Sequence, residues 1–316
     1  MEAIGGYFSL ELPLREEYHK VAIRLNTGRN GLEYILRARG YKKVYVPYYT
    51  CEAVVEPINK VGIQYEFYHI DKHFEISDCF ALEDGEGLLY TNYFGLKQRY
   101  VEQLAEQFGS RLIVDNTQAF YAKPIQGIDT LYTCRKFFGV ADGAYLYTDK
   151  LLDDEFVRDE SYDRMAHLLK RIDLSAEQGF ADFRKADDGL DNQPIRKMSK
   201  LTQRIMQSID YEAAAKKRRE NFQNLHKALG EENDLELTLE EGNVPMIYPF
   251  LSHLQGLRER LIKNRIFVAR YWPNVLEWTS DKEFEHFLAS QMLPLPIDQR
   301  YGKEEMNYII KTIHER

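Results

Sequence analysis

Residues 130–148, TLYTCRKFFGVADGAYLYT, decide how the whole chain is interpreted. The stretch predicts a strand, a tight polar turn that carries Lys136, a second turn at Asp142-Gly143, and a returning strand. A lysine held by backbone between two turns has a defined position, as an amine needs if it is to lose its proton and attack a carbonyl carbon. A surface lysine on a hairpin explains this stretch equally well, so the surrounding sequence must separate the two interpretations.

The sequence before this stretch alternates between strand and helix patterns. Strands are predicted at residues 43–47, 63–70, 87–91 and 111–114, and helices at 52–61 and 100–108. This rhythm predicts an α/β fold with a mostly parallel central sheet and helices on both faces. In such sheets ligands bind at the carboxyl ends of the strands. Asn92, Asp115 and the triplet at 48–50 all follow predicted strands, so we expect them to lie near a site.

A loop that turns into a helix precedes these strands, in the sequence IRLNTGRNGLEYIL at residues 23–36. Asn26 or Thr27 can cap the helix. The opening presents free backbone N–H groups and the positive end of the helix dipole to an anion. Many helices begin in this way without a ligand, so the pattern has weight only in combination with others.

The second half of the chain predicts a smaller domain. Residues 151–171 have a helical pattern, 173–199 predict a long irregular connection, and 200–229 predict one long helix. Beyond it we expect a strand at 244–250, a helix at 254–264, a strand at 266–271 and a closing helix at 304–314. The predicted division is a large domain at residues 1–205, with an N-terminal arm over residues 1–19, and a small C-terminal α+β domain at 206–316.

Composition excludes several classes of function. The net charge of −8 argues against a nucleic-acid or membrane-surface role, because there is no excess of cations to neutralise phosphates. No apolar run is long enough to cross a bilayer, and the N-terminal sequence lacks a signal-peptide pattern, so a cytoplasmic location is expected. Three scattered cysteines, Cys51, Cys79 and Cys134, indicate neither a disulfide framework nor a metal site.

Asp115 and Gln118 add chemistry to Lys136. Asp115 lies 21 residues before the lysine (136 − 115), and Gln118 follows it by three. A buried carboxylate at the end of a central strand is costly unless it faces a cation, and a protonated pyridine nitrogen is such a cation. Taken alone, a capping aspartate is the more frequent reading. With the lysine turn and the helix opening, the set has the parts that pyridoxal 5′-phosphate needs: an amine for a Schiff base, a partner for the pyridinium and a site for the phosphate.

At this point the sequence resembles a known family, the DegT/DnrJ/EryC1/StrS sugar aminotransferases, which have the fold-type-I architecture of aspartate aminotransferase. The matching stretches are TGRNGLEYIL, VYVPYYTCEAVVEPINKVGI, NYFG, LIVDNTQAF and YTCRKFFGVADGAYL, followed in the C-terminal half by KMSKLTQRIMQSIDYEAAAKKRRENFQNL, RYWP and LPLPIDQRYG. The resemblance covers nearly the whole chain. Its most specific parts are Asp115 with Gln118, and Lys136 with Asp142-Gly143.

The resemblance implies a role for each matching residue. Lys136 resembles the catalytic lysine that forms the Schiff base, and Asp115 the catalytic carboxylate on the pyridine nitrogen. Gln118 resembles the residue beside the cofactor's hydroxyl face. Gly28 and Arg29 match the helix opening that holds the phosphate through backbone N–H groups.

Other positions are also assigned to the cofactor site by the resemblance. Thr133 is expected in the role of the family's phosphate-binding serine. Cys51 stands where most members have the aromatic ring that stacks on the cofactor. Either Tyr49, Tyr93 or another tyrosine is expected to substitute for that ring, or the cofactor is expected to be held less tightly. Asn92 is expected to line the site beside Tyr93.

The function that the resemblance implies is transfer of an amino group from an amino acid such as glutamate to a nucleotide-linked keto-sugar, in surface polysaccharide or secondary metabolite synthesis. A homodimer is implied as the working unit. Two alternatives stay open: a pyridoxal enzyme of the same architecture that eliminates or dehydrates, and a non-catalytic relative that binds a sugar nucleotide or a partner protein.

Overall fold

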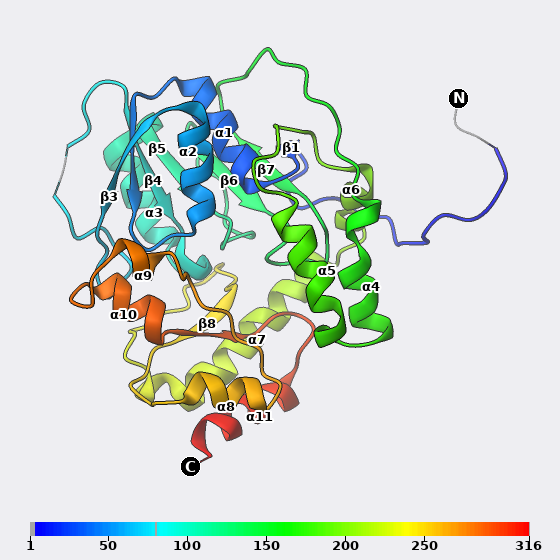
Figure 1. Cartoon of the computed structure of the whole chain (residues 1–316), viewed down its shortest axis with the longest axis vertical. Helices are drawn as coiled ribbons and strands as arrows, with labels where there is room; N and C mark the ends of the chain where they lie inside the picture. Colours follow the sequence, from blue (N-terminus) through cyan, green and yellow to red (C-terminus); the bar gives the residue numbers. More distant parts are fainter. Residues whose placement is uncertain (1–3, 80, 316) are drawn as a thin grey trace.

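The computed structural model describes residues 4–79 and 81–315, and its centre is a seven-stranded sheet (Figure 1). The strands, in spatial order, are β1 (Ile23–Leu25), β7 (Ala144–Tyr147), β6 (Asp129–Thr133), β5 (Leu112–Asp115), β4 (Glu86–Thr91), β2 (Lys43–Pro47) and β3 (Gln64–Tyr68). Strands β3, β2, β4, β5 and β6 pair in parallel, whereas β7 runs antiparallel to β6 and β1. The predicted mostly parallel sheet is therefore confirmed.

Helices cover both faces of this sheet because its strands alternate their side chains between two apolar cores. Helix α1 (Gly28–Arg39) and helix α2 (Val55–Val61) pack on one face of the sheet. They share a core with the strand residues that point to that face, such as Val44, Leu89 and Ile113. Helix α3 (Gln98–Phe108) packs on the other face, against a core rich in aromatic rings. Strands β4 and β5 are buried on both faces, and each contains an unbroken apolar run, at residues 88–90 and 112–114.

The C-terminal part forms the predicted smaller α+β unit around its own core. Its two-stranded antiparallel sheet consists of β8 (Ile247–Phe250) and β9 (Leu293–Pro296). Helices α7 (Tyr211–Leu229), α8 (Leu257–Lys263) and α11 (Lys303–His314) pack with this sheet, and α9 (Val275–Trp278) and α10 (Phe284–Gln291) lie between α8 and β9 in the chain. The division between residues 205 and 206 falls inside α6 (Lys200–Met206), and it remains a prediction.

The predicted irregular connection at 173–199 is wrong for half of its length, because helix α5 (Ala176–Asp188) forms there and pairs with α4 (Ala166–Asp173). Ser175 caps α5 by accepting a hydrogen bond from the Gln178 N–H at 3.3 Å. Gly179 allows the close approach of the two helices, since a Cβ there would lie 2.9 Å from the His167 carbonyl oxygen. The helix is thus stabilised by a cap and by its neighbour, although its own apolar pattern is weak.

Three other predicted elements also need correction. The helix predicted over 151–171 is restricted to α4, because residues 157–159 run extended and exchange backbone hydrogen bonds with Lys197. The long helix predicted over 200–229 breaks into α6 and α7, and Asp210 caps the second by accepting from the Ala213 N–H. The strand predicted at 266–271 has alternating burial but no strand partner in the part of the chain that the structure describes.

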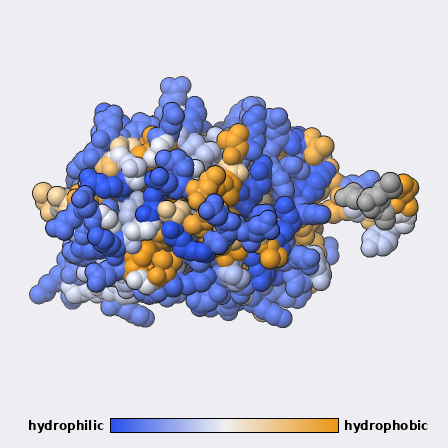
Figure 2. All heavy atoms as spheres, turned by 90° about the horizontal axis from the view of Figure 1, so that it is seen from above, coloured by the Kyte–Doolittle hydropathy of each residue, from blue (hydrophilic) through white to orange (hydrophobic). Residues whose placement is uncertain are grey.

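The N-terminal arm leaves the body of the protein as an extended segment (Figures 1 and 2). Its apolar side chains are exposed, among them Tyr7 and Phe8 at 98% and 92%. The arm is tied to α6 by Arg204, whose guanidinium donates to the carbonyls of Leu12 and Pro13. Residues 1–3 of the predicted arm lie outside the described residues.

Candidate active site

One pocket, of about 210 Å³, lies at the carboxyl ends of β4, β5 and β6, on the face that α1 covers. The residues that line it are Thr27, Gly28, Arg29, Leu32, Thr50, Cys51, Ala53, Val54, Leu89, Thr91, Asp115, Thr117, Gln118, Leu131, Thr133, Arg135, Lys136, Asp187 and Trp272. Seven of the residues predicted for the site are among them: Lys136, Asp115, Gln118, Gly28, Arg29, Thr133 and Cys51.

Successive side chains of a strand point to opposite faces of the sheet, and this alternation explains which side chains face the pocket. Along β4 and β5, Leu89 and Ile113 belong to the core under α1, so Thr91 and Asp115, two residues further on, point to the same side. Thr91 and Asp115 are paired in register, and Thr133 follows Leu131 on the next strand by the same rule. Three polar side chains therefore reach the floor of one pocket from three adjacent strands.

Lys136 lies in the turn that follows β6, as the sequence predicts. The N–H groups of Phe137 and Phe138 both donate to the carbonyl of Cys134, at 3.1 and 2.9 Å, and both rings are buried. The turn is thus held by its backbone and by two apolar anchors. The lysine side chain is exposed toward the pocket, and its Nζ donates to the Thr117 hydroxyl at 3.1 Å.

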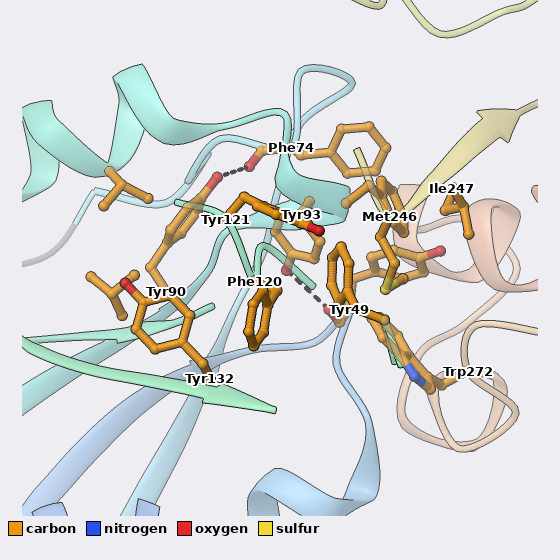
Figure 3. Close-up of a cluster of buried hydrophobic side chains, with 14 of the residues drawn as sticks. Tyr49, Phe74, Tyr90, Tyr93, Phe120, Tyr121, Tyr132, Met246, Ile247 and Trp272 are labelled. Carbon is orange, nitrogen blue, oxygen red and sulfur yellow. Dashed lines mark hydrogen bonds between the residues drawn. The ribbon is translucent and has the colours of Figure 1, made fainter. Parts of the chain in front are cut away.

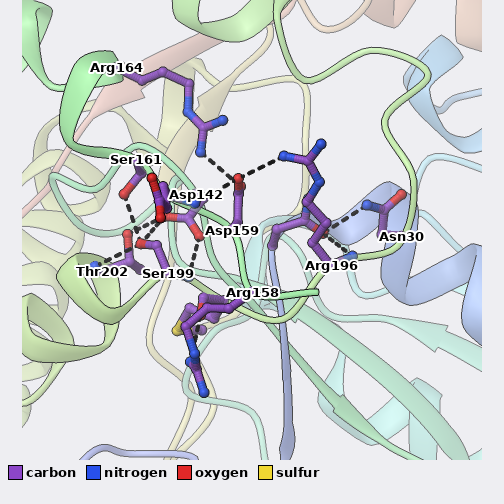
Figure 4. A network of polar contacts seen from close by, with 12 residues as sticks. Asn30, Asp142, Arg158, Asp159, Ser161, Arg164, Arg196, Ser199 and Thr202 are labelled. Carbon is purple, nitrogen blue, oxygen red and sulfur yellow. Dashed lines mark hydrogen bonds and ion pairs between the residues drawn. The ribbon is translucent and has the colours of Figure 1, made fainter. Parts of the chain in front are cut away.

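The far end of the same loop is fixed by Asp142, which is fully buried (Figure 4). Its carboxylate accepts hydrogen bonds from the backbone N–H and the hydroxyl of Ser199, each at 2.8 Å, and from the hydroxyl of Thr202. Gly143 follows with φ of 115°, and a Cβ there would lie 2.8 Å from Thr202. The loop that carries Lys136 is therefore anchored to the start of α6.

Asp115 is 5% exposed at the end of β5, and its Oδ1 accepts a hydrogen bond from the Thr117 N–H at 2.8 Å. None of the ion pairs among the described residues involves this carboxylate. Thr117 therefore connects the two expected catalytic groups, because its backbone binds Asp115 while its hydroxyl binds Lys136. A buried anion that faces a pocket without a protein cation is suited to a cationic ligand.

The N-terminus of α1 forms another wall of the pocket. Thr27 caps the helix by accepting from the Asn30 N–H at 3.1 Å, as the sequence predicts. Gly28 keeps this wall open, since a Cβ there would lie 3.3 Å from the Thr117 methyl group. The guanidinium of Arg29 pairs with Glu56 at 2.9 Å and Asp191 at 2.7 Å, so its backbone N–H is the group left for a ligand.

Gln118 and Thr133 are both buried, and each is oriented by one hydrogen bond. The amide oxygen of Gln118 accepts from the Phe94 N–H at 2.9 Å, so the NH₂ group is the part left to donate toward a ligand. The Thr133 hydroxyl donates to the Gly143 carbonyl at 3.3 Å.

Cys51 and Trp272 line the pocket from different parts of the chain. Burial raises the pKa of the Cys51 thiol, although the nearby charges of Lys136 and Arg29 oppose that effect. The indole of Trp272 is 8% exposed and contacts the ring of Tyr49 edge-on, with 5.0 Å between ring centroids. Trp272 is the only aromatic side chain among the described lining residues.

Three residues predicted for the site lie elsewhere, and two of them, Tyr49 and Tyr93, belong to the aromatic core (Figure 3). Tyr49 and Tyr93 are fully buried, and the Tyr93 hydroxyl donates to the Tyr49 carbonyl at 2.9 Å. Asn92 is also fully buried, where its side-chain oxygen accepts from the Lys97 N–H at 3.0 Å. None of the three lines the pocket in this structure.

Thr50, from the triplet at 48–50 that was expected near a site, lines the pocket. Sequence reasoning did not single out five further lining residues: Thr91, Thr117, Arg135, Asp187 and Trp272. Thr117 could have been found from the sequence, because an aspartate side chain often accepts a hydrogen bond from the backbone N–H of the residue two positions later, here Thr117 after Asp115. Arg135 and Asp187 form an ion pair at 2.7 Å, but Asp187 lies on the helix that the sequence did not predict.

In the described part of the chain, no group of histidine, cysteine and acidic residues has the arrangement of a metal site. Within the same residues, no helix has both the length and the apolar content to span a bilayer.

Comparison with known proteins gives the fold. No protein-family model and no curated protein matches the sequence. Solved structures do match: DesV of S. venezuelae in complex with a ketimine intermediate has a TM-score of 0.65 and 15% identity, over 92% of this chain and 83% of that one. A DegT DnrJ EryC1 StrS aminotransferase from Brucella abortus has a TM-score of 0.61 and 16% identity, over 92% and 84%. NtdA from Bacillus subtilis, with bound cofactor PMP, has a TM-score of 0.62 and 14% identity, over 94% and 75%. These similarities confirm the predicted fold.

Proposed function

We propose that this chain is a pyridoxal 5′-phosphate-dependent aminotransferase that acts on a keto-sugar. One observation carries the proposal: a single pocket holds an exposed lysine amine, a buried carboxylate without a protein cation, and the open N-terminus of a helix. Several of the structures with the same fold are described as sugar aminotransferases, and NtdA is described with the amino form of this cofactor.

The residues of the pocket fit such a cofactor. Gly28 leaves space at the helix opening that a side chain would fill, and Asp115 supplies a negative charge for a pyridinium. The Thr91 hydroxyl, on the pocket floor, is buried and has no hydrogen-bond partner within the described residues. An unpaired buried hydroxyl is costly, and a polar ligand would satisfy it.

Each group then has a task. When bound, pyridoxal phosphate supplies an aldehyde and an electron-accepting ring. With that group bound, the Lys136 amine would be the residue that holds its aldehyde carbon, and as a free amine it would take the proton from the donor α-carbon on its Nζ and return it on the cofactor side. Asp115 would hold the proton on the pyridine nitrogen, and the backbone N–H groups of Gly28 and Arg29 would hold the phosphate.

The experiment has two stages. Purified protein is incubated with the cofactor, reduced with borohydride and digested, and the modified peptide is located by mass spectrometry. We expect the adduct on Lys136, retained in the control Lys123→Ala, an exposed lysine outside the pocket, and lost in Lys136→Ala. An adduct that persists in Lys136→Ala contradicts the assignment.

The second stage separates the alternatives. Addition of L-glutamate to the loaded protein should convert the cofactor to its amino form and release 2-oxoglutarate. A loaded protein that responds to no amino donor counts against transamination and favours the elimination or dehydration chemistry. A protein that binds no cofactor favours a non-catalytic sugar-nucleotide or partner-binding role.

We further propose that the working unit is a homodimer. The exposed apolar arm, with Ile4, Tyr7, Phe8 and Leu10, is a surface that a second copy can cover (Figure 2). Half of the tyrosines, 11 of 22, are buried and are not part of that surface. Light scattering at working concentration tests the idea, and an active monomer would refute it.

A further inference from the structure

The pocket contains one arginine that has a single carboxylate partner among the described residues, and that partner is 43% exposed to solvent. Of the three cationic side chains that line it, Arg29 is bound by two carboxylates, and Lys136 occupies the expected covalent position. Arg135 makes one hydrogen bond within the described residues, from its terminal nitrogen to Asp187 Oδ1 at 2.7 Å. Its side chain is 19% exposed and, like that of Lys136, lines the pocket.

Asp187 holds Arg135 only loosely. It lies in the last turn of α5, and its side chain is 43% exposed. Ion pairs with an exposed partner contribute little free energy, because water screens the charges and competes for the same hydrogen bonds. A ligand carboxylate can therefore replace Asp187 at small cost, and a guanidinium binds such a group through two parallel hydrogen bonds.

We propose that Arg135 binds the α-carboxylate of the amino donor and releases Asp187 as it does so. The inference rests on the proposed function and adds to it the residue that selects amino acids as donors. The α-carboxylate is attached to the carbon that bears the reacting nitrogen, so it must lie close to the Lys136 amine. Arg135 is the neighbour of Lys136 in the chain and faces the same pocket. The phosphates of a nucleotide-linked sugar lie several bonds further from the reacting carbon, so they fit this position less well.

The test compares Arg135→Met and Asp187→Asn with the wild type. Arg184→Met is a matched control, since Arg184 lies on α5 near Asp187 but is 63% exposed and outside the pocket. The first readout is direct binding by calorimetry of glutarate, a dicarboxylate without an amino group, and of inorganic diphosphate. The second is the KM for L-glutamate in the donor half-reaction, and the third is borohydride trapping on Lys136.

We expect Arg135→Met to weaken glutarate binding and to raise the KM for L-glutamate by roughly tenfold to hundredfold, the range for loss of a charged hydrogen-bonded pair. Trapping on Lys136 should be unchanged, and Arg184→Met should behave as the wild type. Asp187→Asn should lower the KM for L-glutamate, because it removes the competing carboxylate.

The proposal is overturned if Arg135→Met leaves both glutarate affinity and the donor KM unchanged. It is also overturned if that variant loses diphosphate binding only, which would assign Arg135 to a phosphate, or if Asp187→Asn raises the donor KM. A wild-type protein that traps no cofactor would refute the proposed function instead. In that case glutarate binding still decides whether Arg135 binds a carboxylate.

Discussion

Asp115 carries a charge in a place where a charge is expensive. It is 5% exposed on a central strand, and it has one backbone hydrogen bond and no ion pair among the described residues. A buried, unpaired carboxylate of this kind destabilises the fold unless a cationic ligand pairs with it. Asp115→Asn keeps the shape and the bond from the Thr117 N–H but removes the charge. We therefore expect the variant to fold and to form the adduct on Lys136, with a donor half-reaction slowed by roughly a hundredfold or more.

The measurement is the rate of the half-reaction with L-glutamate, together with a thermal melt. Asp84→Asn, an exposed aspartate remote from the pocket, is the matched control and should match the wild type in both. A wild-type rate in Asp115→Asn would remove the role assigned to this carboxylate.

At the same scale, the limits of sequence reasoning follow from side-chain direction. The position of Asp115 was predicted correctly from the predicted end of its strand, because β5 stays paired in register with both neighbouring strands up to that residue. Tyr49 and Thr50 follow β2 in an irregular segment, where the sequence does not specify which side each residue faces. Thr50 lines the pocket and Tyr49 enters the core. Asn92 and Tyr93 lie in the turn after β4, where Phe94 has φ of 56°, a conformation that no periodicity predicts.

At the scale of elements, α5 shows why part of the site was not predicted. Its position depends on Gly179 against His167, a contact between two helices, whereas sequence patterns report mainly on a segment's own amphipathicity. Ser175, with Gln178 three residues later, has the spacing of a helix N-cap, so the start of α5 could have been predicted from the sequence. The strands and helices around the sheet were predictable because their apolar periods and their caps agree.

The segment that leads from the arm into β1 is attached to the core by His19. This side chain is 1% exposed, and its Nε2 is 2.8 Å from the Phe120 carbonyl oxygen. Burial lowers the pKa of His19 from 6.5 to about 4, and the carbonyl only partly opposes that shift. Below pH 6.5 the unfolded chain therefore takes up a proton that the folded chain refuses until about pH 4. Folding stability should accordingly be complete above pH 6.5 and fall by roughly 3 kcal/mol as the pH drops to 4.

Urea unfolding at pH 7.5 and pH 4.5 measures this effect in the wild type and in His19→Gln, which retains polar groups but does not titrate. The carboxylates titrate in both proteins, so the difference between their pH dependences isolates His19. An equal loss of stability in the two proteins would show that His19 is not the cause. His73→Gln, a histidine outside this core, should keep the wild-type pH dependence.

At the scale of the whole molecule, the sequence predicts the fold and the two-part architecture, but not how the C-terminal part supports the lysine loop. The link is Arg218 on α7, which is 1% exposed. Its guanidinium donates to the carbonyls of Met246 and Phe137, at 2.9 and 3.3 Å, and lies 4.5 Å from the centre of the Phe137 ring. In the sequence, position 218 belongs to a basic run at residues 216–219 within a helical pattern, and such a run predicts a solvated face. The buried role of Arg218 is therefore not expected from the sequence.

Arg218 has no carboxylate partner within hydrogen-bonding distance among the described residues, and burial lowers its pKa to about 10, so it stays charged at neutral pH. A buried cation satisfied by carbonyls and a ring fixes those carbonyls in place. One of them belongs to Phe137, the residue after Lys136, and Gln299 donates to the same oxygen at 2.8 Å. Two side chains of the C-terminal part thus hold the backbone of the lysine turn.

We therefore expect Arg218→Met to affect the reaction as well as the fold. Loss of the charged hydrogen bonds leaves the Met246 carbonyl without its donor, which should cost roughly 2–4 kcal/mol of stability. The loosened turn should slow the donor half-reaction by about tenfold or more even where the variant is fully folded, because small displacements of a reacting group are expensive. Arg218→Lys should not restore the rate, since an ammonium cannot reach the same carbonyls in one plane.

Lys216→Met on the same helix, with its side chain 79% exposed, is the control for both readouts. The rate is measured at a temperature well below the melt of the variant, and a destabilised Arg218→Met with a wild-type rate would confine Arg218 to a structural role.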